Sequence, residues 1–439
     1  MPATVVIGGQ WGDEGKGRVV DFFAQKCSLI ARYSAGSNAG HTIVNELGRF
    51  GLHLVPAGVF SGKTCVVGNG LVIDPRKLLD EIEMLESRGV DTSKLLVSSR
   101  AQVVMPWHVV IDELDELMRA EHGQAIGTTR TGTGPAFVDK AARLGIRMID
   151  LVTPEIFVER LRFVLEYKNR VITDLYGAEP LPFGHVRDEY LAMGEQLWPY
   201  VTETATVLQQ ADARGEQILL EGAQGALLDL DSGTYPYVTS SVPASVAAGA
   251  CIGTGLGPRS IERVIGVYKA YMTRVGNGPF PTELLDADGD RLRDHGIDQG
   301  TGEYGTTTGR PRRCGWFDGV LGRYSVALNG VTSVALTRLD VLSQFERVKV
   351  CTAYELAGER VHTLPAALED AMAVRPLYEE LPGWGTDVSH VRHLADLPPE
   401  ARSYVARVEE LLGAPVDMIS VGPERDQAIV TRDVFGRPL

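Results

Sequence analysis

Short apolar runs rich in β-branched residues recur along the chain and alternate with amphipathic stretches. The first run, residues 3–9, ends in glycines and precedes a segment, residues 15–25, that is compatible with a helix. Runs of this length, bounded by Gly and polar residues, are typical of buried strands. Further strands are expected at 28–33, 64–70, 94–99, 217–222, 263–271, 332–340 and 347–356.

Three longer stretches have the spacing of helices, at 75–89, 188–214 and 398–413, the last of them beginning with Pro and ending at Gly413. Strands that alternate with helices predict an α/β fold with a large, mainly parallel central sheet flanked by helices. Because no segment has the composition of a linker, we expect residues 1–439 to form a single α/β domain.

Three Gly-rich polar segments, 122–135, 222–257 and 296–316, are longer than ordinary connections. Long patterned loops between buried strands commonly carry ligand contacts. We therefore expect these segments to be substrate loops.

Composition narrows the functional classes. The 439 residues are 44% hydrophobic and 23% charged, as in globular proteins, and the net charge of -14 argues against a surface that binds nucleic acid or an anionic membrane. The five cysteines are scattered and form no C-x-x-C pair, which indicates a reducing compartment rather than disulfides or a zinc site. The first residues have no pattern of a signal peptide, so a cytoplasmic location is expected.

The segment from Gly8 to Asp21, GGQWGDEGKGRVVD, resembles a phosphate-binding loop. A Gly-rich turn into a helix directs backbone N–H groups and the helix dipole at an anion, and Lys16 adds a positive charge. Yet Gln10 replaces the first Gly of the usual pattern and Gly17 replaces the hydroxyl residue that holds magnesium. A plain Gly-rich turn is the alternative.

Two carboxylates, Asp13 and Glu14, lie in this loop, where they would repel a triphosphate. Either a cation intervenes or one of them accepts a proton. Asp13 is the candidate for both tasks, as a Mg²⁺ ligand in place of the missing hydroxyl and as a base. The sequence gives no separate role for Glu14.

Other polar motifs follow expected strands. In SAGSNAGHTIV, residues 34–44, His41 titrates near neutrality, although a lone His is often structural. GTTRTGTGPAF, residues 127–137, is dense in hydroxyl and N–H donors suited to phosphate, or it is a simple turn. The segment 219–241 offers Gln224 and Thr239 after a strand end, where open parallel sheets bind ligands.

Two motifs near the C-terminal third favour anion and base recognition. Three arginines lie within residues 310–313, and Arg forks suit carboxylates and phosphates, whereas a solvated basic loop is the alternative. Asp340 ends the apolar run TSVALTRLD, and a carboxylate there can accept hydrogen bonds from the N1–H and amino group of guanine.

Taken together, QWGDEGKG, NAGHT, GTGPA, GTYPYVTSS, TRVGNGPFPTEL, TTTGRPRRCGW, LPGW and SVGP are similar in order and spacing to the adenylosuccinate synthetase family. The resemblance runs from residue 4 to about residue 432. It implies a Mg²⁺-dependent ligase, with a nucleotide site like that of P-loop NTPases, that joins IMP to L-aspartate and cleaves GTP. The products would be adenylosuccinate, GDP and phosphate, in the first committed step from IMP to AMP.

The resemblance also implies roles for individual residues. Asp13 would take the N1 proton of IMP, so that O6 attacks the γ-phosphate and forms 6-phosphoryl-IMP, and His41 would act as acid and charge stabiliser. The amine of aspartate would then displace phosphate from C6. Arg143 would reach the IMP of the partner subunit in a homodimer.

The remaining implied contacts are grouped by ligand. GTP would contact Gly12, Asp13, Glu14, Gly15, Lys16, Gly17, Arg18, Gly40, His41, Thr42, Arg312, Arg338, Leu339, Asp340, Ser420, Val421 and Gly422. IMP would contact Asp13, Lys16, Asn38, Thr129, Arg143, Gln224, Thr239 and Arg310. L-Aspartate would contact Thr306, Thr307, Thr308, Gly309, Arg310 and Arg312, and Mg²⁺ would bind Asp13 and the Gly40 carbonyl.

Two other functions are compatible with part of this pattern. One is a related enzyme acting on another 6-oxopurine nucleotide such as dGMP, and the presence of Asp13 argues against it. The other is a guanine-nucleotide switch without ligase activity, which would need Lys16 and Asp340 but not Asp13, His41 or the arginine loop.

Overall fold

In the computed structural model, which describes residues 3–242, 246–305, 309–432 and 434–435, ten strands form one central sheet. Its order is β10-β8-β6-β2-β11-β1-β12-β16-β20-β21, and each neighbouring pair is parallel except β20 with β21. The strands are β1 (Ala3–Gly8), β2 (Leu29–Arg32), β6 (Thr64–Val67), β8 (Leu95–Ser98), β10 (Val201–Thr202), β11 (Ile218–Glu221), β12 (Ile261–Lys269), β16 (Ser333–Thr337), β20 (Val416–Ser420) and β21 (Ala428–Val430). The predicted mainly parallel sheet is confirmed.

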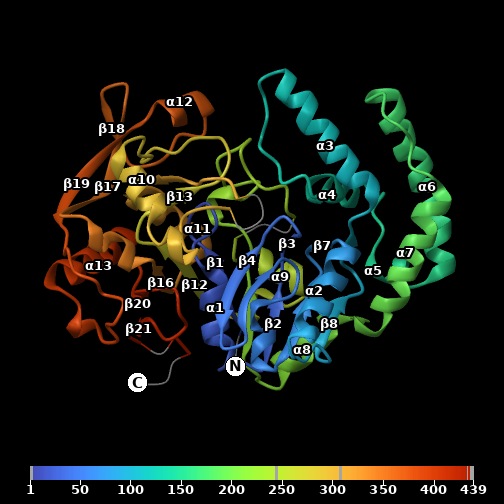
Figure 1. Cartoon of the computed structure of the whole chain (residues 1–439), viewed down its shortest axis with the longest axis horizontal. Coiled ribbons are helices and arrows are strands. Elements are labelled where there is room, and N and C mark those ends of the chain that lie inside the picture. The colour runs from blue at the N-terminus through green and yellow to red at the C-terminus, as the bar shows by residue number, and fades with distance from the viewer. Residues whose placement is uncertain (1–2, 243–245, 306–308, 433, 436–439) are drawn as a thin grey trace.

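Helices cover both faces of this sheet (Figure 1), and its central strands are therefore buried on both sides. Strand β1 shows the alternation: Val6 belongs to one apolar core, whereas Val5 and Ile7 belong to the other. The helices are α1 (Lys16–Ala24), α2 (Pro75–Ser87), α3 (Pro106–Glu121), α4 (Thr133–Ala142), α5 (Met148–Leu151), α6 (Pro154–Arg170), α7 (Phe183–Leu197), α8 (Thr204–Ala213), α9 (Gly249–Thr254), α10 (Ala287–Asp294), α11 (Gly319–Asn329), α12 (Leu368–Ala373) and α13 (Pro399–Leu412).

Smaller sheets surround the central one. The run predicted at 347–356 is strand β17 (Arg347–Leu356), but it pairs with β15, β18 and β19 in a separate sheet at the edge of the molecule. Buried and more exposed residues alternate along much of β17, as expected for a sheet with one face toward solvent. The other strands are β3 (Ala35–Gly36), β4 (His41–Asn45), β5 (Gly48–Leu52), β7 (Leu71–Ile73), β9 (Gln102–Val103), β13 (Met272–Arg274), β14 (Arg313–Gly315), β15 (Phe317–Asp318), β18 (Glu359–Val361) and β19 (Arg375–Pro382).

The long helix predicted at 188–214 is wrong. Helix α7 ends at Leu197, a 3₁₀ turn spans Trp198–Tyr200, and the edge strand β10 precedes α8. Pro199 has no N–H to continue the α-helical hydrogen bonds, and Val201 and Thr202 pair with β8 instead. The predicted helices at 75–89 and 398–413 are confirmed as α2 and α13, and Gly413 ends α13 in the left-handed conformation.

Candidate active site

A cavity of about 850 Å³ opens at the carboxyl edge of the central sheet. The last residues of β2, β11, β12 and β16, which together with β1 form the middle of the sheet, line it: Arg32 of β2, Glu221 of β11, Lys269 of β12 and Thr337 of β16. Open parallel sheets bind ligands at this edge because the loops that follow the strands converge there.

Most of the predicted site residues line this one cavity. They come from the loop after β1 and the start of α1, from the turn into β4, from the segment between α3 and α4, from the residue before β14, from the loops after β11 and β16, and from the end of β20 with the loop that follows it. The set comprises Gly12, Asp13, Glu14, Gly15, Lys16, Gly17, Arg18, Asn38, Gly40, His41, Thr42, Thr129, Gln224, Thr239, Arg312, Arg338, Ser420 and Gly422.

A few predicted residues lie elsewhere. Among the described residues, Arg143, Gly309, Arg310, Leu339, Asp340 and Val421 do not line the cavity. The aspartate contacts predicted at Thr306, Thr307 and Thr308 fall outside the described residues. Arg143 is exposed at the end of α4, where its guanidinium donates to the Ala141 carbonyl at 2.6 Å.

The loop between β1 and α1 is shaped by left-handed backbone. Gly12, Asp13 and Gly15 have φ values of 86°, 59° and 93°. Successive N–H groups in such a turn point to one side and form an anion-binding concavity at the start of α1. No side chain caps α1, so its first N–H groups remain available to a ligand.

The carboxylate of Glu14 is turned into this loop and is fully buried. It accepts hydrogen bonds from the backbone N–H groups of Gln10 at 3.0 Å and Gly12 at 2.9 Å, and it pairs with Lys16 at 2.6 Å. Glu14 therefore holds the loop closed from within. The GTP contact expected of Glu14 stays a prediction, and with this carboxylate turned inward it would fall to the main chain.

The two departures from the common phosphate-loop pattern have local causes. The side chain of Gln10 ties the loop to the end of β12, donating to the Lys269 and Tyr271 carbonyls and accepting from the Lys269 N–H. A Cβ at Gly17 would lie 3.1 Å from the Cβ of His41. A Ser or Thr at position 17 is thus disfavoured by the His41 side chain packed there.

His41 lies at the start of β4 with its ring almost enclosed. Burial, followed by the charges of Arg32, His53 and Lys16, holds the pKa of His41 well below its usual value. Its Nδ1 lies 3.5 Å from Oε1 of Glu221, whose pKa burial raises to about 7. Within the described residues, Nε2 of His41 is buried without a hydrogen-bond partner.

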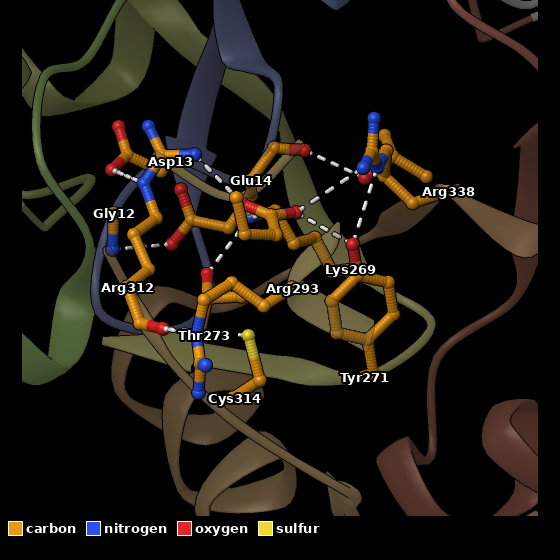
Figure 2. Close-up of polar contacts among 12 residues, drawn as sticks. Gly12, Asp13, Glu14, Lys269, Tyr271, Thr273, Arg293, Arg312, Cys314 and Arg338 are labelled. Carbon is orange, nitrogen blue, oxygen red and sulfur yellow. Dashed lines mark hydrogen bonds and ion pairs between the residues drawn. The ribbon is translucent and has the colours of Figure 1, made fainter. Parts of the chain in front are cut away.

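Asp13 projects toward the cavity, and a third of its side chain is exposed. Its Oδ2 pairs with Nε of Arg312 at 2.7 Å, and Nη1 of Arg312 donates to the buried Glu303 at 2.7 Å. Figure 2 shows Asp13 and Arg312 on one side of this polar cluster, Tyr271 and Arg338 on the other, and Lys269 between them.

A second region of the site joins α1 to the segment that follows β20. Arg18 donates to the Ser420 hydroxyl and to the carbonyls of Gly422, Glu424 and Gln427. Burial lowers the pKa of Arg18 to about 10, although Asp340 opposes the shift. In the described part of the chain, Oδ1 of Asp340 is buried without a hydrogen-bond partner.

The residues present can accommodate Mg²⁺. Among the described residues, no three His, Cys, Asp or Glu side chains gather into a metal site. Magnesium uses one or two carboxylates together with phosphate oxygens and water, so the cavity-facing carboxylate of Asp13 and the nearby Gly40 carbonyl suit it.

Sequence reasoning missed several polar residues of the site. Lys269, Arg274 and Glu303 line the cavity, as do Arg32 and Glu221. Arg32, Glu221, Lys269 and Arg274 are the last residues of buried strands, and Glu303 lies in the Gly-rich segment 296–316, so a comparison of all strand ends and this segment could have indicated them. Within the described residues, no helix is long and apolar enough to span a bilayer.

The fold and the site define an α/β enzyme that binds a nucleotide phosphate chain next to an acid and a histidine. Residues 5–429 match the family model of adenylosuccinate synthetase. An adenylosuccinate synthetase of Carboxydothermus hydrogenoformans is 50% identical over 436 residues, which are 99% of this chain and all of that protein. One from Brevibacillus brevis is 49% identical over 437 residues, again 99% of this chain and all of the relative.

Solved structures agree. The fully ligated adenylosuccinate synthetase of Plasmodium falciparum superposes with a TM-score of 0.91 at 35% identity, covering 98% of this chain and all of that one. The succinoaminodeoxyadenylate synthetase of cyanophage S-2L, bound to dGMP and dATP, shares the fold at a TM-score of 0.59 and 22% identity, over 98% of this chain and 96% of that one. This chain belongs to the adenylosuccinate synthetase family, and it is a ligase that joins IMP to L-aspartate with cleavage of GTP on the route to AMP.

Proposed function

We propose that the ligation proceeds through 6-phosphoryl-IMP, with Asp13 as the base and His41 as the group that stabilises the transferring phosphoryl. The observation that carries this proposal is the position of Asp13. Its carboxylate faces the cavity from inside the phosphate loop, next to Lys16 and across from His41.

Oxygen O6 of IMP is a poor leaving group and a poor nucleophile while N1 carries a proton. When the Asp13 carboxylate accepts that proton, the charge moves to O6, which attacks the γ-phosphorus and releases GDP. The amine of L-aspartate then attacks C6, and the phosphate leaves with its bridging oxygen. The ion pair between Asp13 and Arg312 has to rearrange when the ligands bind, because Asp13 acts on IMP and Arg312 binds L-aspartate.

The phosphate side of the reaction relies on Lys16, the N-terminus of α1 and His41. His41 and Glu221 lie 3.5 Å apart, and burial lowers the histidine pKa while it raises the glutamate pKa to about 7. The low pKa keeps His41 neutral near pH 7, and a neutral imidazole whose Nδ1 faces Glu221 can present its one hydrogen at Nε2 to a phosphoryl oxygen. A preorganised donor of this kind stabilises charge that develops in the transition state.

Guanine is recognised by Asp340 and the segment from Ser420 to Gly422. A buried carboxylate oxygen without a protein partner is costly, and the N1–H and amino group of guanine would satisfy it. Leu339 and Val421 are buried in the apolar core beside these positions in the sequence, and Arg338 lines the cavity.

The other two substrates use the loops that the sequence singled out. Asn38, Thr129, Gln224 and Thr239 line the cavity beyond the phosphate loop and would hold IMP. L-Aspartate would meet Arg312 in the cavity, with Arg310, Gly309 and the threonines at 306–308 closing over its carboxylates.

Asp13 and the Gly40 carbonyl would hold Mg²⁺, which lessens the negative charge on the phosphate oxygens when it is bound. Asp13 thus faces both ligand groups from one position, with its second oxygen available to IMP. The assignment is supported by the shared lining of Asp13 and Gly40 in the cavity.

The enzyme would act as a homodimer in the cytoplasm. Arg143 is exposed on α4 and, in the described structure, lies away from the cavity of its own chain, which is consistent with a role in the site of a second copy. The five free cysteines, four of them buried, fit a reducing compartment.

Omission of single substrates tests the function. We expect purified protein to release phosphate from GTP only when IMP and L-aspartate are both present, because the chemistry couples all three. A guanine-nucleotide switch would cleave GTP without them, and an enzyme for dGMP would stay inactive with IMP. Either result would exclude the proposal.

A further inference from the structure

We propose that Glu303 is a positioning residue, whose buried carboxylate holds Arg312 and Arg338 in place and thereby joins the aspartate side of the site to the guanine side. This inference rests on the proposed functions of these two arginines. Glu303 itself would contact no substrate.

The carboxylate of Glu303 is the common partner of four polar side chains, which make five contacts with it. Its Oε1 accepts from the Tyr271 hydroxyl at 2.5 Å and from Lys269 at 2.9 Å, and its Oε2 accepts from Lys269 at 2.8 Å. Arg312 donates to Oε2 at 2.7 Å, and Nη2 of Arg338 lies 3.5 Å from Oε1. The two arginines thus approach one carboxylate from opposite sides.

Each arginine has further fixed contacts. Arg338 donates to the Tyr271 hydroxyl at 3.2 Å and to the Thr301 carbonyl at 2.8 Å. In Arg312, Nη1 is held by Glu303 at the rear while Nε faces Asp13, whose side chain is one-third exposed. Glu303 therefore leaves the cavity-facing edge of Arg312 in a defined orientation toward Asp13 or an incoming carboxylate.

Charge balance makes this carboxylate necessary. Three cations, Lys269, Arg312 and Arg338, surround Glu303, and Asp13 is the other acid in contact with them. Burial opposes the charge of Glu303, but Lys269, Arg338 and Arg312 outweigh it and hold the pKa of Glu303 far below its usual value. Without this charge, the cations would repel one another in a buried setting.

Glu303 also lies at the base of a substrate loop. The N–H of Arg312 donates to the Glu303 carbonyl at 2.9 Å, and Tyr304 and Pro311 form the next bridge. The ends of the segment 304–311 are therefore joined by backbone and side chain at the same pair of residues. Loss of the contact between Arg312 and Glu303 would therefore loosen the base of the loop that is expected to bind aspartate.

The test is the isosteric variant Glu303→Gln, assayed in the full-length enzyme with each substrate varied in turn. We expect the KM for L-aspartate to rise about 10- to 100-fold, since the free-energy contribution of a hydrogen bond to a charged group corresponds to a change of this size. The KM for GTP should rise in parallel through Arg338, whereas the KM for IMP should change little. A merely structural role would lower the melting temperature and kcat without this selectivity.

Glu283→Gln is the matched control. Glu283 pairs with Arg313, the residue next to Arg312, at the start of β14, and neither Glu283 nor Arg313 lines the described cavity. The control loses a comparable ion pair on the same strand, and its KM for aspartate should stay near the wild-type value. An equal effect in both variants would overturn the inference.

Two further variants test the proposal if Glu303→Gln folds poorly. Glu303→Asp retains the charge and should recover part of the aspartate affinity. In a Glu303→Gln background, Arg312→Ala should add little, because Glu303 acts through Arg312. A wild-type aspartate KM in the Glu303 variants would reject the positioning role alone, whereas an inactive wild-type enzyme would reject the proposed function.

Discussion

At the scale of single residues, the phosphate loop divides its tasks among neighbours. The Glu14 carboxylate accepts hydrogen bonds from N–H groups of the loop itself, and Gly17, which has no side chain, leaves room for the His41 ring. Asp13 is thereby the one carboxylate of the pair that faces the cavity. The two neighbouring carboxylates point in opposite directions because the backbone at Asp13 has a left-handed conformation, which turns the Glu14 side chain back into the loop.

Substitution of Asp13 tests its role as the base. We expect Asp13→Ala and Asp13→Asn to fold normally, since a partly exposed side chain is removed, and to lose activity by several orders of magnitude. Steady-state rates and thermal unfolding would be measured on the same samples. Substantial turnover in Asp13→Asn would refute general base catalysis by this residue.

The contiguous motifs could be found from the sequence because the ligand contacts lie on short loops with distinctive residues. The cluster around Glu303 could not, because its partner Lys269 is 34 residues away and meets it only through the sheet topology. The same holds for His41 at the start of β4 and Glu221 at the end of β11, which are far apart in the sequence and lie 3.5 Å from each other in the fold. Pairing across strands is the information that a single sequence lacks.

At the scale of elements, α4 presents a residue outward. The helix ends at Ala142, and Arg143 caps it in the left-handed conformation with an exposed side chain. Helix α4 itself is held by a buried group in which Asp139 contacts His108 at 2.9 Å and also pairs with Lys168 of α6. The position of Arg143 on the surface is therefore rigidly defined.

Mixed dimers test whether Arg143 serves the partner's site. Asp13→Ala and Arg143→Ala should each be inactive or severely impaired when assayed alone. After mixing and subunit exchange, hybrid dimers contain one intact site, so about a quarter of the wild-type activity should return. If the mixture stays as inactive as its components, Arg143 does not act across a dimer interface.

Helix α11 carries a buried acid at its start. Asp318 accepts hydrogen bonds from the N–H groups of Val320 and Leu321 at 3.0 Å and from the Tyr354 hydroxyl at 2.6 Å. Burial nevertheless raises the pKa of Asp318 to about 6. The folded state thus holds a proton that the unfolded state releases, and this stabilisation is present below pH 4 and lost as the pH rises through about 6.

Asp318→Asn removes this titration. Relative to the variant, the wild-type free energy of unfolding should fall by about 1 kcal/mol between about pH 5 and pH 7.5. Urea unfolding at both pH values measures the difference. A gap between wild type and variant that does not change with pH would contradict the shifted pKa.

At the scale of the whole molecule, the central sheet lies between the two large apolar cores. The strands in the middle of the sheet contribute alternate residues to both, as Val5 and Val6 of β1 illustrate. The cores therefore cannot separate without breaking the same strands. The single domain predicted from the sequence stays a prediction; this sharing of strands supports it and gives it a thermodynamic consequence.

We expect one cooperative unfolding transition. Trp107 reports on one core and Trp316 and Trp384 on the other, while circular dichroism reports on helices throughout. Their denaturation curves should coincide, because shared strands couple the cores. Separate midpoints for fluorescence and circular dichroism would show that the two sides unfold independently.

The contacts of Arg18 also bear on how the protein is made. The guanidinium at the start of α1 is bound by carbonyls of the segment after β20, and 402 residues separate Arg18 from Ser420. Asp21, one turn further along α1, pairs with Arg425 of the same segment. During translation, the phosphate loop emerges first but acquires these partners only after nearly all the chain has been synthesised. The nascent protein consequently cannot complete these contacts around the start of α1 until the ribosome has passed Arg425.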